Sequence, residues 1–128
     1  MKQAVSTTKS PTPAGSYSQG IVVGALVFVA GQGPVDASTS RSAMDIAGQT
    51  HQAIRNVRAI LAEAGCTLED VVKVTAHLAN VDDFGDFDRV YGEYFRDPYP
   101  VRTTVASRLI DGLVEIDAIA YRSDGPDG

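Results

Sequence analysis

One arginine and one glutamate stand out because each lies in a run that otherwise predicts a buried strand. Arg102 follows Pro100 and Val101, and Glu115 lies within the apolar run of residues 114–118. A buried charge is costly unless it is paired. The partner of each group is therefore either another side chain, which makes a structural ion pair, or a charged substrate.

The elements around these two residues predict one sheet with two helices. Residues 21–29 form a hairpin that turns at Gly24, and residues 71–79, 101–107 and 113–121 form three further strands. Helical spacing predicts one helix over residues 46–64, with Ser42 and Asp45 as a capping box and Gly65 after its end. A second helix is predicted from Asp83 to Phe95, capped by Asp82 or Asp83. This order predicts an α+β domain with both helices on one sheet face.

Strand alternation divides the side chains of the last three strands between two faces. The face predicted to lie under the helices carries Val72, Val74, Ala76, Leu78, Val101, Thr103, Val105, Val114, Ile116, Ala118 and Ala120. The second face is predicted to gather Lys73, Thr75, His77, Arg102, Thr104, Glu115 and Asp117. From the pattern alone, a face in contact with water is favoured over a functional one. Apolar positions such as Ile119 and an uncovered side instead indicate packing against other copies of the chain.

Size and charge exclude several classes of protein. The chain has 128 residues, which predicts one domain over 1–128 with an irregular arm at 1–16 and a disordered tail at 123–128. The net charge of −5 disfavours partners recognised through phosphate groups. The single cysteine, Cys66, and an N-terminus without the apolar core of a signal peptide favour a cytoplasmic location. No apolar run is long enough for a membrane span, and no zinc-type spacing is present.

A series of short motifs extends along nearly the whole chain. They are Pro13–Gly20, Ala30–Pro34, Asn56–Leu61, Ala64–Gly65, Asp70–Thr75, Tyr91–Phe95, Pro100–Arg102 and Val114–Ala120. In this order and spacing, the chain resembles the RidA family, also called YjgF, of imine deaminases. Members are often labelled endoribonuclease L-PSP or translation inhibitors.

The resemblance implies a chorismate-mutase-like α+β fold, assembled as a homotrimer with clefts between neighbouring subunits. It implies hydrolysis of reactive enamine or imine intermediates to 2-keto acids and ammonia. No cofactor and no metal would take part, and neither nucleic acid nor membrane would be a partner.

The resemblance also assigns roles to individual residues. Arg102 matches the arginine that holds the substrate carboxylate, and Glu115 matches the glutamate that holds the attacking water. Tyr17 matches a tyrosine that lines the cleft, and the backbone at Gly31 matches a segment that contacts the substrate. The remaining substrate-binding positions differ from well-known members: Ala30 replaces a serine, Thr104 a cysteine and Asp88 an asparagine.

Asp88 matters most, because an ionised carboxylate would repel an anionic substrate unless it is protonated, paired or turned away. From the pattern alone, the acidic run of Glu69, Asp70, Asp82, Asp83, Asp86 and Asp88 is interpreted as a solvated face.

Other interpretations remain open at this point. Arg102 could form only a structural ion pair with Glu115 or Asp117. The protein could be a non-catalytic or chaperone-like trimer that binds a small carboxylate. A ribonuclease or translation inhibitor is the least favoured alternative, because the chain lacks a basic stripe.

Overall fold

The computed structural model describes residues 1–122, which form a six-stranded mixed sheet and two α-helices. The predicted tail at 123–128 lies outside these residues. In chain order the elements are β1 (Gln3–Val5), β2 (Gly20–Val23), β3 (Leu26–Gln32), α1 (Ile46–Glu63), β4 (Val71–Leu78), α2 (Phe84–Tyr94), β5 (Val101–Ala106) and β6 (Val114–Tyr121). Short 3₁₀ turns at Leu68–Asp70 and Val81–Asp83 precede β4 and α2.

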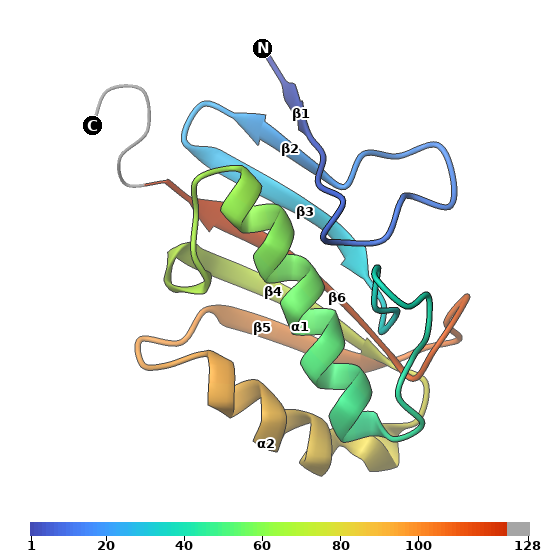
Figure 1. Cartoon of the computed structure of the whole chain (residues 1–128). Coiled ribbons are helices and arrows are strands. Elements are labelled where there is room, and N and C mark those ends of the chain that lie inside the picture. The colour runs from blue at the N-terminus through green and yellow to red at the C-terminus, as the bar shows by residue number, and fades with distance from the viewer. Residues whose placement is uncertain (123–128) are drawn as a thin grey trace.

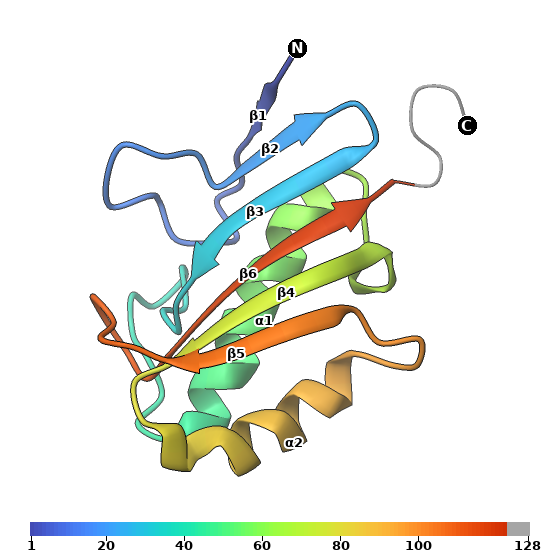
Figure 2. The same cartoon turned by 180° about the vertical axis from the view of Figure 1, so that it is seen from behind.

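The sheet order is β1-β2-β3-β6-β4-β5, and only the β4–β5 pair is parallel. Figure 1 shows α1 and α2 lying across the same face of this sheet. Figure 2, from behind, shows the other face without a helix over it. The predicted α+β layer and the hairpin at Gly24, whose φ is +58°, are confirmed. The arm at 1–16 is not wholly irregular, because β1 pairs with β2.

Helix α1 provides most of the core on the covered face. Its buried side includes Ile54, Val57 and Leu61, which repeat at helical spacing and pack against the sheet. Asp45 caps it by accepting a hydrogen bond from Gly48 N at 3.1 Å, without the predicted part of Ser42. Gly65 follows the helix at φ +82°, which an L-residue rarely adopts, so the predicted stop is confirmed.

Helix α2 lies beside β5, and its N-terminus is capped differently from the prediction. Asn80, rather than Asp82 or Asp83, accepts a backbone hydrogen bond, from Asp82 N at 2.9 Å at the 3₁₀ turn. Asp83 stands at the N-cap of α2 without a capping hydrogen bond. The chain therefore leads into α2 through a 3₁₀ turn, and not through the predicted side-chain cap on the helix itself.

Two predictions about the sheet faces are wrong. Val72 is exposed, because an irregularity between Val71 and Lys73 breaks the alternation at the start of β4. On β5 the whole assignment is inverted: Arg102 pairs in register with Val74, which is fully buried under the helices. Alternation defines two sets of residues without saying which set faces inward, and a shift of one residue exchanges them.

The uncovered face consequently carries more apolar surface than predicted. Val101 is 67% exposed and Val105 41% exposed on this face, beside Phe28 and Tyr121 from β3 and β6. Lys73 and His77 of β4 lie in register between these side chains, so the exposed apolar residues of this face are interspersed with polar ones. Within the described residues, no helix is both long and apolar enough to cross a membrane.

Candidate active site

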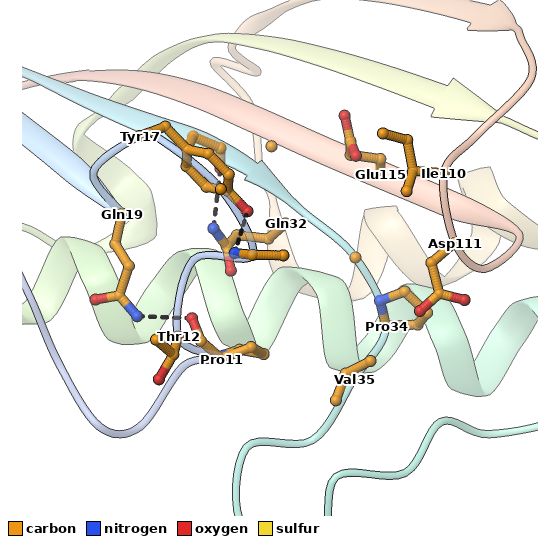
Figure 3. Close-up of a pocket in the computed structure, with 15 residues that line it drawn as sticks. Pro11, Thr12, Tyr17, Gln19, Gln32, Pro34, Val35, Ile110, Asp111 and Glu115 are labelled. Atoms are coloured by element: carbon orange, nitrogen blue, oxygen red, sulfur yellow. Dashed lines mark hydrogen bonds between the residues drawn. The ribbon is translucent and has the colours of Figure 1, made fainter.

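A pocket of about 580 Å³ opens at the end of β3 and is shared by the N-terminal arm, β6 and the loop before β6. Figure 3 shows Tyr17 from the arm, Glu115 from β6, and Ile110 and Asp111 from the loop around it. Ala30 and Gly31, at the end of β3, also line it. We call this the Glu115 pocket. The structure thus brings together four of the predicted site residues, namely Tyr17, Ala30, Gly31 and Glu115.

The Glu115 carboxylate lies directly against the backbone of Gly31. A Cβ atom built at residue 31 would stand 2.6 Å from Glu115 Oε2, so any larger residue would displace the carboxylate. The register of β3 against β6 shifts between Val29 and Gln32, and this irregularity carries Ala30 and Gly31 past β6. Bulges next to functional sites commonly re-aim a strand in this way.

The arm that carries Tyr17 is held by one buried glutamine. The Gln19 side chain donates to the carbonyls of Thr7, Ser10 and Pro11 and accepts from Thr7 N at 2.7 Å. These side-chain hydrogen bonds replace the strand-to-strand backbone hydrogen bonds that residues 7–17 lack. Tyr17 itself is half exposed, and its hydroxyl accepts from Ala14 N at 3.2 Å.

A second pocket, of about 440 Å³, lies between α2 and the start of β5. It is lined by Asp88, Tyr91, Gly92, Tyr99, Pro100 and Arg102. We call this the Arg102 pocket. The guanidinium carbon lies 4.5 Å from the ring centre of Tyr91, with Phe87 and Phe84 at 5.3 and 5.6 Å. Cation–π contacts of this kind hold an arginine head in place while leaving N–H donors available.

Arg102 pairs with Asp88, and not with Glu115 or Asp117. Arg102 Nη1 lies 2.9 Å from Asp88 Oδ1, with the two side chains 19% and 51% exposed. The interpretation of Arg102 as a partner of Glu115 or Asp117 is therefore wrong. Asp88 is therefore not only part of a solvated acidic face. Of the three states considered for it, the structure shows the paired one, with Arg102 as its partner.

Tyr91 underlies the guanidinium and remains protonated over the physiological range. Burial raises the pKa of Tyr91 to about 12, although the nearby Arg102 charge acts in the opposite direction. Its ring is nearly fully buried and forms part of the hydrophobic core. Tyr91 can shape the pocket but is unsuited to act as a base.

Within one chain, Arg102 and Glu115 lie on opposite faces of the sheet. Arg102 is in register with buried Val74, whereas Glu115 is in register with His77 on the uncovered face. The prediction that they share a face is wrong for the reason given for β5. Thr104 follows Arg102 to the covered side, in register with Ala76, and lines neither pocket.

Among residues 1–122, no three His, Cys, Asp or Glu side chains are grouped so that they could hold a metal ion. The chemistry that the described residues offer is that of a carboxylate, a guanidinium and backbone groups. The predicted absence of a cofactor stays a prediction.

A family model described as Endoribonuclease L-PSP matches residues 7–122. The chain belongs to this family. It is 48% identical over 124 residues to a RutC family protein of Pyrococcus abyssi, covering 94% of this chain and 98% of the relative. It is 36% identical over 128 residues to an Escherichia coli protein named "Putative reactive intermediate deaminase TdcF", covering 96% and 99%.

Solved structures of family members confirm the fold. The crystal structure of E. coli TdcF with bound serine aligns with a TM-score of 0.90 at 35% identity, covering 94% of this chain and 99% of that one. RidA from a Psychrobacter species aligns with a TM-score of 0.90 at 36% identity, covering 93% and 98%. The predicted membership in the RidA and YjgF family is therefore confirmed, and the family includes a relative named as a putative reactive intermediate deaminase.

Sequence reasoning missed two parts of the pockets: the loop residues that line them and the role of the aromatic rings under Arg102. Tyr99, Ile110 and Asp111 line the pockets, but they lie in loops where no periodic pattern exists. The aromatic bed under Arg102 was visible as Phe84, Phe87 and Tyr91 at helical spacing. Only the true face of β5 reveals that this apolar stripe serves a cation.

Proposed function

We propose that this protein hydrolyses reactive enamine or imine intermediates to 2-keto acids and ammonia. The observation that carries the proposal is the Glu115 carboxylate against the bare backbone of Gly31, in a pocket that Tyr17 also lines. Within residues 1–122, the Glu115 side chain makes no hydrogen bond or ion pair, so its carboxylate oxygens are available to a water. The names of its relatives support the same class of reaction.

In the proposed reaction, Glu115 orients a water and accepts one of its protons as the oxygen adds to the imine carbon. The nitrogen leaves as ammonia once the tetrahedral intermediate is protonated and its C–N bond breaks. The carbonyl that remains is the 2-keto acid. The net change adds one water and releases one ammonia, so no oxidant or reductant is needed.

We further propose that the active unit is a homo-oligomer, a trimer by family resemblance, with each cleft formed by two chains. Arg102 and Glu115 lie on opposite faces of one sheet, so a single chain does not present both to one small substrate. The apolar uncovered face supports an association that brings the Glu115 pocket of one copy to the Arg102 pocket of another. Arg102 would then bind the acceptor oxygen of the substrate, which the family resemblance gives as that of a carboxylate.

The test couples a serine or threonine dehydratase to this protein and follows keto-acid and ammonia release. Arg102→Ala should lose on the order of 2–5 kcal/mol of transition-state binding, since it removes a charge-assisted contact. Glu115→Gln keeps the shape but removes the proton acceptor. Arg89→Ala, an exposed arginine on α2, is the matched control and should behave as wild type. Equal rates for wild type and Arg102→Ala would refute the proposal.

Two other functions stay as outcomes of the same experiment. Binding of 2-ketobutyrate by wild type without any imine turnover would favour a non-catalytic carboxylate-binding oligomer. The family's descriptive name raises ribonuclease activity, but the net charge of −5 argues against phosphate-directed binding. RNA cleavage that survives purification and is lost in Arg102→Ala would favour that function instead.

A further inference from the structure

The guanidinium of Arg102 already has an anionic partner in its own chain. Asp88 lies 2.9 Å from Arg102 Nη1 and lines the same pocket, so a ligand entering the pocket meets both charges. Among residues 1–122 this is the one ion pair that Asp88 makes, because the neighbouring Arg89 pairs with Asp86 and Glu93. The positive charge offered to a ligand is thus largely neutralised.

The surroundings of Arg102 do not let it turn toward a different ligand position. Its guanidinium lies over the rings of Phe84, Phe87 and Tyr91, all of which belong to α2. Asp88 also belongs to α2, one turn after Phe84 and one before Tyr91. The cation, its aromatic bed and its counter-ion therefore form one unit, in which the counter-ion occupies the more exposed side.

We propose that Asp88 is a specificity-determining residue that disfavours small carboxylate substrates and favours imines carrying an uncharged acceptor, such as an amide carbonyl, at Arg102. This rests on the proposed function. A second carboxylate would be repelled by Asp88 and would find Nη1 engaged, so a bidentate contact through both Nη atoms is lost. A neutral carbonyl needs only one of the remaining N–H donors and does not have to displace Asp88. Discrimination then comes from a repulsive element built into the pocket.

The test compares two stable ligands that differ in this charge alone, 2-ketobutyrate and 2-ketobutyramide, by calorimetry. Wild type should bind the amide at least as tightly as the acid. Asp88→Asn should tighten binding of the acid by about tenfold, because the like charge is removed, and change amide binding by less than about threefold. In coupled turnover assays, Asp88→Asn should raise kcat/KM for carboxylate imines in the same proportion.

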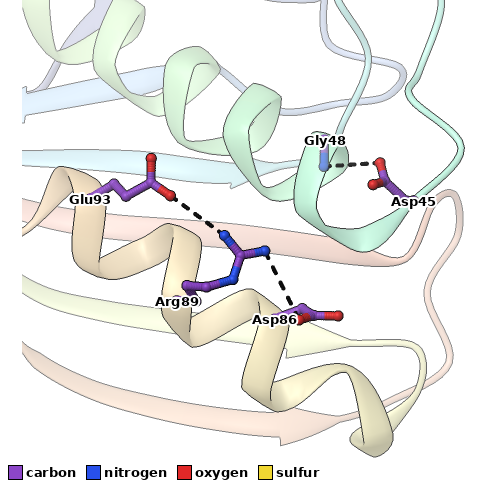
Figure 4. Close-up of polar contacts among 5 residues, drawn as sticks. All are labelled: Asp45, Gly48, Asp86, Arg89 and Glu93. Carbon is purple, nitrogen blue, oxygen red and sulfur yellow. Dashed lines mark hydrogen bonds and ion pairs between the residues drawn. The ribbon is translucent and has the colours of Figure 1, made fainter.

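Asp86→Asn is the matched control. Figure 4 shows Asp86 on the same helix, turned toward Arg89 at 4.0 Å, and it lines neither pocket. This variant removes the same charge from the same element, so it measures the effect of net charge alone. It should leave both affinities as in wild type.

The inference is overturned if Asp88→Asn leaves the affinity for 2-ketobutyrate within twofold of wild type. It is equally overturned if Asp86→Asn gives the same gain, or if wild type binds the acid more tightly than the amide. Imine turnover by wild type with no effect of Asp88→Asn would retain the proposed function and reject only the role of Asp88. A lack of imine turnover by wild type and by Asp88→Asn would reject the proposed function, and a lack of ligand binding by every variant would reject both.

Discussion

The Glu115 carboxylate and the Gly31 backbone are in such close contact that a Cβ atom at residue 31 would lie 2.6 Å from Glu115 Oε2. The contact joins a strand end on β3 to a side chain on β6 across the register irregularity between them. The side chain at position 31 therefore determines where the carboxylate lies, and with it the position of any water that Glu115 holds.

Gly31→Ala should reduce kcat/KM for imine hydrolysis by about 100-fold, since small displacements of a positioning group are costly. The carboxylate is the far end of a flexible side chain and can move away, so unfolding by urea should change by less than about 1 kcal/mol. Gly85→Ala on α2 is the control, because an added Cβ there contacts nothing within 4 Å and residue 85 lines neither pocket. Full activity in Gly31→Ala would show that this contact has no part in the reaction.

Activity should be restored by mixing two inactive variants. Arg102→Ala and Glu115→Gln each inactivate one of the two pockets. After the two variants are co-refolded in equal amounts, each pocket of an inter-chain cleft is intact in about half of the cases, so about a quarter of the clefts should contain two intact pockets. If both groups acted from the same chain, no cleft would be intact. The measurement is the turnover rate of the mixture against each variant refolded alone; a mixture as inactive as its components would contradict sites formed between chains.

Stability should fall at high pH through Tyr91. The raised pKa, about 12 against about 10 in the unfolded chain, means that the unfolded state releases this proton first. The contribution is complete below pH 10 and decreases as the pH rises toward 12, by about 1 kcal/mol at pH 11. Urea unfolding of wild type and Tyr91→Phe at pH 8 and pH 11 measures it, and the variant should lose less stability between the two. An identical loss in both proteins would assign the alkaline sensitivity to other groups.

Asn56→Ala should destabilise the fold by about 2–4 kcal/mol. Asn56 is fully buried and donates to the carbonyls of Gly33 and Val35 at 3.1 and 2.9 Å, so its loss leaves two acceptors unsatisfied. Equilibrium urea unfolding measures the change. Gln52→Ala, which removes only the donor to Asn56 Oδ1, is the control and should cost less than about 1 kcal/mol. Similar losses in both variants would show that the two carbonyls are not the cause.

The sequence predicted the fold well because its helices and strands have clear periods and stops. Helical spacing located α1 and α2, and Gly24 and Gly65 marked a turn and a helix end that require positive φ. β1 was missed, since three residues are too few for a period to show. The prediction of which β5 residues face the helices was wrong, because alternation alone does not say which of the two sets of side chains points inward.

The sequence predicted some of the residues that line the two pockets but not how those residues are arranged. Motif resemblance named Tyr17, Gly31, Arg102 and Glu115, and the structure places the first two with Glu115. The Arg102–Asp88 ion pair depends on how α2 docks against β5, a long-range relation that no local pattern records. Loop residues such as Ile110 likewise reach the pocket only through tertiary structure.

The uncovered sheet face has a kinetic consequence if each cleft needs two chains. Val101 and Val105 lie on that face, and neither lines the Glu115 pocket. A polar substitution at Val105 would leave each folded chain intact and yet make the specific activity depend on protein concentration, falling on dilution as neighbours separate. In such a protein, the surface that holds neighbours together sets the turnover rate as directly as the residues that contact substrate.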